Sequence, residues 1–176
     1  MVHWRASARE ALAAREFPPQ GQLLDVNGTQ VHAEVMGSGP DVILLHGAGG
    51  NTRDMTFSLA PKLAERYRVT VFDRPGLGWT ERAPGDYAGA WNTAAEPPFA
   101  QASLLQGAAE QHGIERPIVV GQSFGGAVAF AWALSDPDIG AVVSLAGVAN
   151  PWPGNLGITY QVTSSASGGA LVVPLI

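Results

Sequence analysis

The chain has 176 residues, of which 46% are hydrophobic and 14% charged, a balance typical of one folded domain that excludes a disordered protein. Its formal net charge of −5 argues against nucleic acid as a partner, because a phosphate backbone requires a basic surface. The sequence contains no cysteine, which excludes disulfides, thiolate metal sites and a cysteine nucleophile.

Residues 1–20 are charged and rich in alanine and predict a surface helix that ends at Pro18-Pro19. This stretch lacks the apolar segment of a secretory signal, and no run in the sequence approaches the roughly 18 apolar residues of a membrane span. We therefore expect a helical extension over residues 1–20, no membrane segment and a cytoplasmic protein.

Two segments that alternate apolar and polar residues, 23–26 and 29–35, predict strands. Asn27-Gly28 lies between them and is a strong signal for a two-residue hairpin turn. The folded core is therefore expected to open with a β-hairpin.

Apolar strands then alternate with helices. The strands are predicted at residues 42–45, 68–72, 117–120 and 141–146, and the helices from Asn51 or Thr52 to about Arg66, at 100–112 and at 125–134, with a long loop over 79–98. This order indicates an α/β fold with a mostly parallel sheet, an N-terminal β-hairpin and helices on both faces. We assign this core to residues 21–150. Residues 151–176 break the pattern and are expected to form the start of a lid or a truncated tail.

One motif carries candidate chemistry. Residues Gly121-Gln122-Ser123-Phe124-Gly125 match G-x-S-x-G, between an apolar strand and a helix of small residues. A sharp strand-to-helix turn raises the serine hydroxyl above the sheet, and the helix N-terminus favours developing negative charge. The alternative is a glycine-rich turn with an incidental serine. The flanking strand and helix favour Ser123 as the nucleophile, with Gly121, Gln122 and Gly125 forming the turn.

A second motif, His46-Gly47-Ala48, ends an earlier strand, as an oxyanion loop should. Acyl transfer requires two backbone N–H groups aimed at the tetrahedral oxygen, and by position these belong to Ala48 and Phe124. His46 could serve as a base. Because the base follows the serine in the triad order of this motif, we expect His46 to be a structural residue that holds the loop.

Three motifs in this order resemble the α/β-hydrolase superfamily over residues 23–150: His46–Gly50, Asp73–Gly78 and Gly121–Gly126. The similar branch is the cofactor-free one that includes esterases, perhydrolase-type haloperoxidases, epoxide hydrolases and C–C bond hydrolases. The resemblance implies hydrolysis of an ester or similar acyl bond in a small-molecule substrate, with no cofactor and no metal. It implies a structural role for Asp73-Arg74.

The chain departs from the family after the nucleophile. The family order is serine, then aspartate or glutamate, then histidine. After Ser123 the sequence has no histidine and no glutamate, and its two aspartates, Asp136 and Asp138, lie in a turn at the opposite edge of the sheet. We therefore find no catalytic acid and no catalytic histidine in this chain.

The four histidines of the chain do not supply the base either. His112 ends a helix at the edge opposite the serine, whereas His3 and His32 are expected on the solvated surface. We expect an incomplete α/β-hydrolase fold that is inactive or nearly so by itself. The alternative is a non-catalytic, hydrolase-derived binding module that uses the same pocket.

The strand at 141–146 is the last clear one and carries no charge or proline. Such an apolar edge recruits other chains, so we expect self-association through it.

Overall fold

The computed structural model describes residues 11–86, 92, 94–150, 157, 158 and 162. The chain divides into two compact units, one made of Gln20–Pro84 with Glu96–Asn150 and the other of Met1–Pro19, Gly85–Ala95 and Pro151–Ile176. In the second unit, residues 11–16 are helical and the helix ends before Pro18. Residues 1–10 and nearly all of the expected lid or tail lie outside the described residues.

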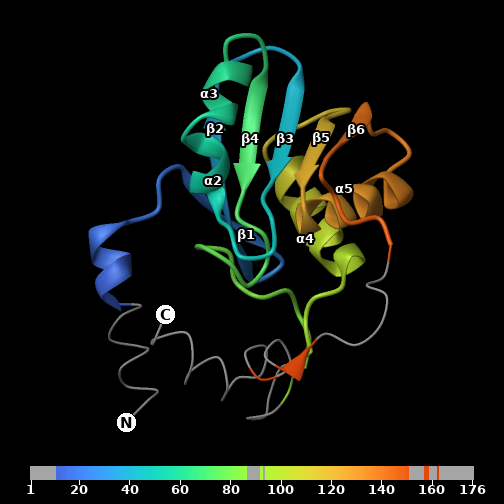
Figure 1. Ribbon diagram of the computed structural model, residues 1–176. Helices are drawn as coiled ribbons and strands as arrows, with labels where there is room; N and C mark the ends of the chain where they lie inside the picture. Colours follow the sequence, from blue (N-terminus) through green and yellow to red (C-terminus); the bar gives the residue numbers. More distant parts are fainter. Residues whose placement is uncertain (1–10, 87–91, 93, 151–156, 159–161, 163–176) are drawn as a thin grey trace. The chain divides into compact units, whose positions relative to one another are not determined.

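The first unit is built on a mixed β-sheet (Figure 1). Its described strands are β1 (Gln22–Val26), β2 (Thr29–Met36), β3 (Asp41–Leu45), β4 (Arg68–Phe72), β5 (Ile118–Gln122) and β6 (Ala141–Leu145). They lie in the order β1-β2-β4-β3-β5-β6, with β2 antiparallel to β1 and β4, and the other neighbours parallel. The predicted α/β architecture with its opening hairpin is confirmed.

The hairpin turn has the geometry that its two residues favour. Asn27 and Gly28 have φ values of 53° and 84°, which suit a turn of the I′ type. The Gly28 N–H donates to Asp25 Oδ1 at 2.8 Å, and Val26 faces Thr29 in the register. The turn therefore fixes the register of β1 on β2.

The described core contains the helices α2 (Thr52–Thr56), α3 (Leu59–Leu63), α4 (Pro98–Gln111) and α5 (Phe124–Ser135). The single helix expected from Asn51 to about Arg66 is wrong, because the structure has two short helices there. Asn51 does cap α2, since its Oδ1 accepts the Arg53 N–H at 2.9 Å. Pro61 explains the break: proline has no N–H and its ring clashes with the carbonyl four residues before it, here that of Phe57.

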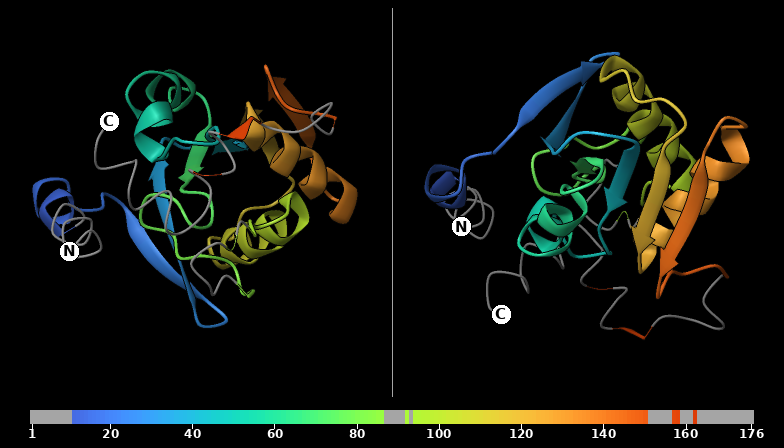
Figure 2. Two further views of the ribbon diagram at one scale, coloured as in Figure 1. Left: turned by 60° about the horizontal axis from the view of Figure 1, so that its bottom comes forward. Right: turned by 90° about the horizontal axis from the view of Figure 1, so that it is seen from above.

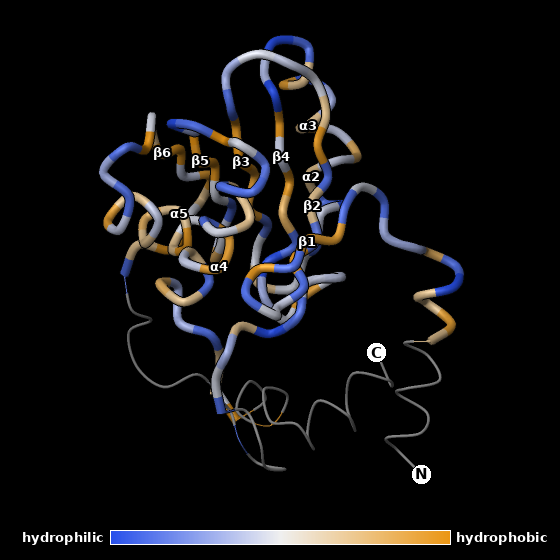
Figure 3. Tube along the Cα trace, turned by 180° about the vertical axis from the view of Figure 1, so that it is seen from behind, coloured by the Kyte–Doolittle hydropathy of each residue, from blue (hydrophilic) through white to orange (hydrophobic). Residues whose placement is uncertain are grey.

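The helices cover both faces of the sheet (Figure 2). Ile43 and Leu45 pack in the cluster that contains residues of α4 and α5, whereas Val42 and Leu44 pack in the cluster that contains residues of α2 and α3. This alternation is the period of two expected when both faces of a strand are buried. Figure 3 shows the apolar character of the central strands.

The edge strand β6 differs from the central strands. Among the described residues it pairs only with β5, and its Val143 and Leu145 are 40% and 37% exposed. None of the helices in the described part of the chain combines the length and hydropathy needed to span a bilayer.

Candidate active site

Three motifs meet at the carboxyl ends of neighbouring parallel strands. The loop that starts at His46 follows β3, Asp73 follows β4 and Ser123 follows β5. From β3 the chain moves to β4 on one side, and from β4 it returns to β5 on the other side of β3. This reversal is a topological switch point, where open α/β sheets bind their ligands.

Ser123 has a strained backbone. Its φ of 52° and ψ of −119° lie in a region that favours glycine. The strain is held by hydrogen bonds on both sides of the residue: its N–H donates to Leu145 O at 3.0 Å, and its carbonyl accepts the N–H groups of Gly126 at 2.9 Å and Val148 at 3.0 Å. The turn is therefore fixed by α5 and by the β6 edge together.

The glycines of the motif are required by close backbone approach. A Cβ on Gly121 would overlap the Gly125 carbonyl, and a Cβ on Gly125 would overlap the Leu45 carbonyl and lie 2.6 Å from His46 O. Strand β5, helix α5 and the end of β3 can meet only because these side chains are absent.

The loop after β3 lies against the serine turn. A Cβ placed on Gly47 would be 2.5 Å from Gln122 Oε1 and 3.3 Å from Ser123 Cβ. None of the hydrogen bonds within the described residues uses the amide of Ala48 or Phe124 as donor. Phe124 is the first residue of α5, and the first amides of a helix have no intrahelical acceptor. The amide of Ala48, which follows Gly47 in this loop, and the amide of Phe124, which follows Ser123, therefore have no acceptor among the described residues.

His46 is fully buried, and both of its ring nitrogens are engaged. Nδ1 donates to Gly47 O at 2.9 Å, and Nε2 accepts the backbone N–H of Arg74 at 2.9 Å. Burial lowers the pKa of His46, in agreement with a neutral ring that carries its proton on Nδ1. The ring connects the loop after β3 to the loop after β4.

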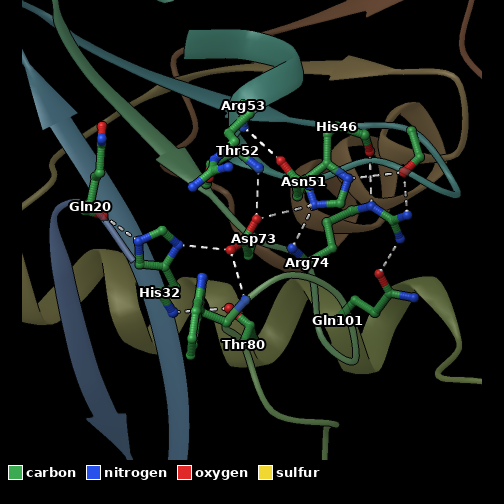
Figure 4. A network of polar contacts seen from close by, with 12 residues as sticks. Gln20, His32, His46, Asn51, Thr52, Arg53, Asp73, Arg74, Thr80 and Gln101 are labelled. Atoms are coloured by element: carbon green, nitrogen blue, oxygen red, sulfur yellow. Dashed lines mark hydrogen bonds and ion pairs between the residues drawn. The ribbon is translucent and has the colours of Figure 1, made fainter. Parts of the chain in front are cut away.

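His32 is not on the solvated surface, as expected from the sequence, but is 1% exposed. Its Nδ1 donates to Asp73 Oδ2 at 2.7 Å and its Nε2 donates to the Gln20 carbonyl (Figure 4). Burial lowers the pKa of His32, but the bonds to Asp73 and Gln20 raise it above the ordinary value. Because both partners are acceptors, they favour the protonated ring. Only the pairing of β2 with β4 brings His32 to Asp73, so no local pattern revealed the contact.

Asp73 connects His32 to the loops around the serine. Oδ1 accepts the Thr52 N–H at 2.7 Å, and Oδ2 accepts the Trp79 N–H at 2.9 Å. Burial raises the pKa of Asp73, but the His32 bond and the two amides outweigh burial and hold it below its usual value.

Arg74 is 2% exposed and lies beneath the loop after β3. Its Nε donates to His46 O at 2.8 Å, Nη2 to Gly47 O at 2.7 Å and Nη1 to Gln101 Oε1 at 2.7 Å (Figure 4). The guanidinium carbon lies 5.1 Å from the centroid of the Phe124 ring. Burial lowers the pKa of Arg74 to about 10.

Other candidate groups lie at the opposite end of the sheet. Asp136 is the C-cap of α5 and accepts the Trp132 indole N–H at 3.1 Å, and His112 is the C-cap of α4. A cavity of about 530 Å³ at that end is lined by residues that include Trp132, Asp136 and Asp138, and it does not include Ser123.

In the described ranges, no histidine ring is hydrogen-bonded to the Ser123 hydroxyl, and no group of three or more His, Cys, Asp or Glu residues could hold a metal ion. His3 lies outside the described residues.

Several known proteins are similar to this chain in sequence or in structure. An uncharacterized protein of Mycobacterium tuberculosis is 32% identical over 122 residues, which are 69% of this chain and 33% of that protein. The pimeloyl-(acyl-carrier protein) methyl ester esterase of Aeromonas hydrophila is 34% identical over 131 residues, which are 70% of this chain and 46% of the esterase. The structure of a meta-cleavage product hydrolase from Pseudomonas fluorescens is similar with a TM-score of 0.57 and 28% identity, over 69% of this chain and 42% of that chain.

The chain thus spans between about a third and a half of the length of these relatives. A family model described as the alpha/beta hydrolase fold matches residues 40–162. The chain therefore belongs to the alpha/beta hydrolase fold family.

Proposed function

We propose that this chain carries the nucleophile and the oxyanion hole of a serine hydrolase that acts on an ester or similar acyl bond of a small molecule. The observation that carries the proposal is the strained backbone of Ser123 at the switch point of the sheet. A residue other than glycine keeps such a conformation only when the surrounding structure enforces it, and such residues cluster at active sites.

The reaction follows from the groups around the serine. Ser123 Oγ attacks the acyl carbon, and the carbonyl π electrons move to the oxygen. The amides of Ala48 and Phe124 donate to this oxyanion. Collapse of the tetrahedral intermediate breaks the bond to the leaving alkoxide, which takes a proton from solvent, and leaves an acyl-serine that water then hydrolyses to the acid and free Ser123. No step requires a metal or a cofactor.

Attack also requires a group that takes the Ser123 proton. His32 and His46 have both ring nitrogens engaged, so neither is free for that task. In serine proteases stripped of the triad, binding and the oxyanion hole still give about 10³–10⁴-fold acceleration over water. We expect the 176-residue chain to show at most this residual rate, with solvent as the proton acceptor.

The experiment is reaction of the chain with a fluorophosphonate probe and with p-nitrophenyl acetate. Mass spectrometry of the digested protein locates the probe, which we expect on Ser123. Ser123→Ala should abolish both reactions. Ser58→Ala is the matched control, because Ser58 is also partly buried and makes no side-chain capping bond. Wild-type labelling that equals that of Ser123→Ala would contradict the proposal.

One observation favours a second candidate, the hydrolase-derived binding module without turnover. No described histidine is bonded to the serine hydroxyl. A module of this kind would bind a small ester in the same pocket, and neither probe would modify Ser123. Labelling of Ser123 therefore decides between the two candidates.

A further inference from the structure

The buried guanidinium of Arg74 has only neutral partners. Its three bonds go to the carbonyls of His46 and Gly47 and to the Gln101 amide oxygen, and it forms no ion pair with a carboxylate of the described residues. Glu96 raises its pKa only from a distance. Burying a charge without a counter-ion is unfavourable, so the position of this side chain calls for a reason.

The hydrogen bond from Arg74 to the Gly47 carbonyl also orients the N–H of Ala48. The Gly47 carbonyl and the Ala48 N–H belong to the same peptide unit, which is planar and trans, so the two groups point in opposite directions. Arg74 Nη2 at 2.7 Å and His46 Nδ1 at 2.9 Å both donate to Gly47 O. Fixing the carbonyl on one side fixes the Ala48 N–H on the other.

The same bonds strengthen the amide as a donor. A carbonyl that accepts hydrogen bonds polarises its peptide unit, which makes the N–H of that unit more positive. The positive charge of Arg74 also lies close to the loop at a buried position, where electrostatic interactions are stronger than in solution.

Arg74 also contacts the other proposed donor residue. Its guanidinium carbon lies 5.1 Å from the Phe124 ring centroid, within the range of a cation–π contact. One side chain therefore links the loop that carries the Ala48 amide to the first residue of α5, which carries the second amide.

We propose that Arg74 is a positioning residue of the oxyanion hole: it clamps the Gly47 carbonyl so that the Ala48 amide is aimed at the acyl oxygen, and it holds Phe124 beside it. This inference rests on the proposed function. It assigns Arg74 no contact with substrate, and its effect acts through the peptide of Gly47 and Ala48.

The test is the rate of Ser123 phosphonylation by a fluorophosphonate probe, in which the phosphoryl oxygen occupies the oxyanion position and fluoride leaves. Removing one oxyanion donor lowers kcat by about 10²–10³-fold in a serine protease. We expect Arg74→Gln, which leaves the donor present but poorly aimed, to lower the maximal labelling rate by about 10- to 100-fold with the half-saturating probe concentration unchanged. The maximal labelling rate of Arg74→Lys should lie between those of the wild type and Arg74→Gln, because lysine keeps the positive charge but lacks the planar fork of donors.

The matched control is Arg68→Gln. Arg68 is the first residue of β4, where it donates to Asp41 and to the Gly113 carbonyl. Arg74 follows the other end of the same strand. We expect this variant to lose stability and keep the labelling rate. Equal losses of rate in the Arg68 and Arg74 variants would assign Arg74 a structural role only and overturn the inference.

A second measurement needs no variant. In ¹⁵N-labelled wild-type protein, phosphonylation of Ser123 should shift the amide protons of Ala48 and Phe124 downfield, and in Arg74→Lys the Ala48 shift should shrink. An unmoved Ala48 amide in the wild type would overturn the positioning role. If Ser123 is labelled in every variant at the wild-type rate, the inference on Arg74 fails while the proposed function stands. If Ser123 is never labelled, the proposed function itself fails.

Discussion

Replacement of Ser123 by glycine should stabilise the protein while it removes the nucleophile. The residue is held at φ 52° and ψ −119°, and such a conformation costs roughly 1–3 kcal/mol for a residue with a Cβ. Glycine relieves this strain but adds roughly 0.5–1 kcal/mol of backbone entropy to the unfolded chain. Ser123→Gly should therefore be more stable than Ser123→Ala by about 1 kcal/mol, the difference between the midpoints of these two ranges, since both lack the hydroxyl and only alanine keeps the strain.

Urea denaturation followed by circular dichroism measures this difference, and for a chain of this size each kcal/mol corresponds to about 2–4 °C in Tm. The control is the same pair of substitutions at Ser103, an exposed position inside α4, where alanine should be the more stable residue by about 1 kcal/mol. If Ser123→Gly is no more stable than Ser123→Ala, the backbone at this position is unstrained, and the surrounding structure does not enforce a strained nucleophile turn.

Three other perturbations follow from the structure. Gly125→Ala should unfold the protein or lower its Tm by more than 10 °C in a thermal melt, because the added Cβ overlaps the Leu45 carbonyl, whereas Gly49→Ala, with open space around its Cβ and no left-handed φ, should cost far less. His32→Gln should cost more stability at pH 5.5 than at pH 8.5 in urea titrations: the raised pKa of His32 means that its contribution is complete below its unfolded value of 6.5 and is lost as pH rises through the folded value. The difference from wild type is the quantity to compare, since His46, with a lowered pKa, acts in the opposite direction; a pH-independent difference would show that the ring is neutral. Val143→Lys should turn a self-associated chain into a monomer of 18.3 kDa in size-exclusion chromatography, because a charge blunts the exposed β6 edge, and a wild type that already elutes as a monomer would refute association through β6.

The local features of the fold were predictable because they depend on near neighbours. Strand β4 has the predicted bounds, and Asn27-Gly28 forms the expected turn. Both depend on neighbouring residues: a strand on a short apolar run, and the turn on two residues that adopt a left-handed backbone. The single helix predicted after Asn51 is two short helices, because Pro61 cannot donate to the Phe57 carbonyl and its ring clashes with that group.

The polar network could not be predicted in the same way. His32 and Asp73 are 41 positions apart, and their bond exists only because β2 pairs with β4. The bonds of Arg74 to His46 and Gly47 likewise depend on the parallel pairing of β3 with β4. The roles of Ser123, Ala48 and Phe124 in catalysis remain predictions, because they depend on how a substrate binds.

The attachment of the serine turn to β6 has a consequence for thermal inactivation. The Ser123 N–H and carbonyl are bonded to Leu145 and Val148, and the strand that carries Leu145 is paired on one side only among the described residues. Edge strands with exposed side chains open locally at a lower free energy than the core of a sheet. Fraying of β6 would release the backbone of Ser123 while the central strands stay folded. The nucleophile is thus coupled to the least protected strand, so its geometry should be lost at a lower temperature than the fold.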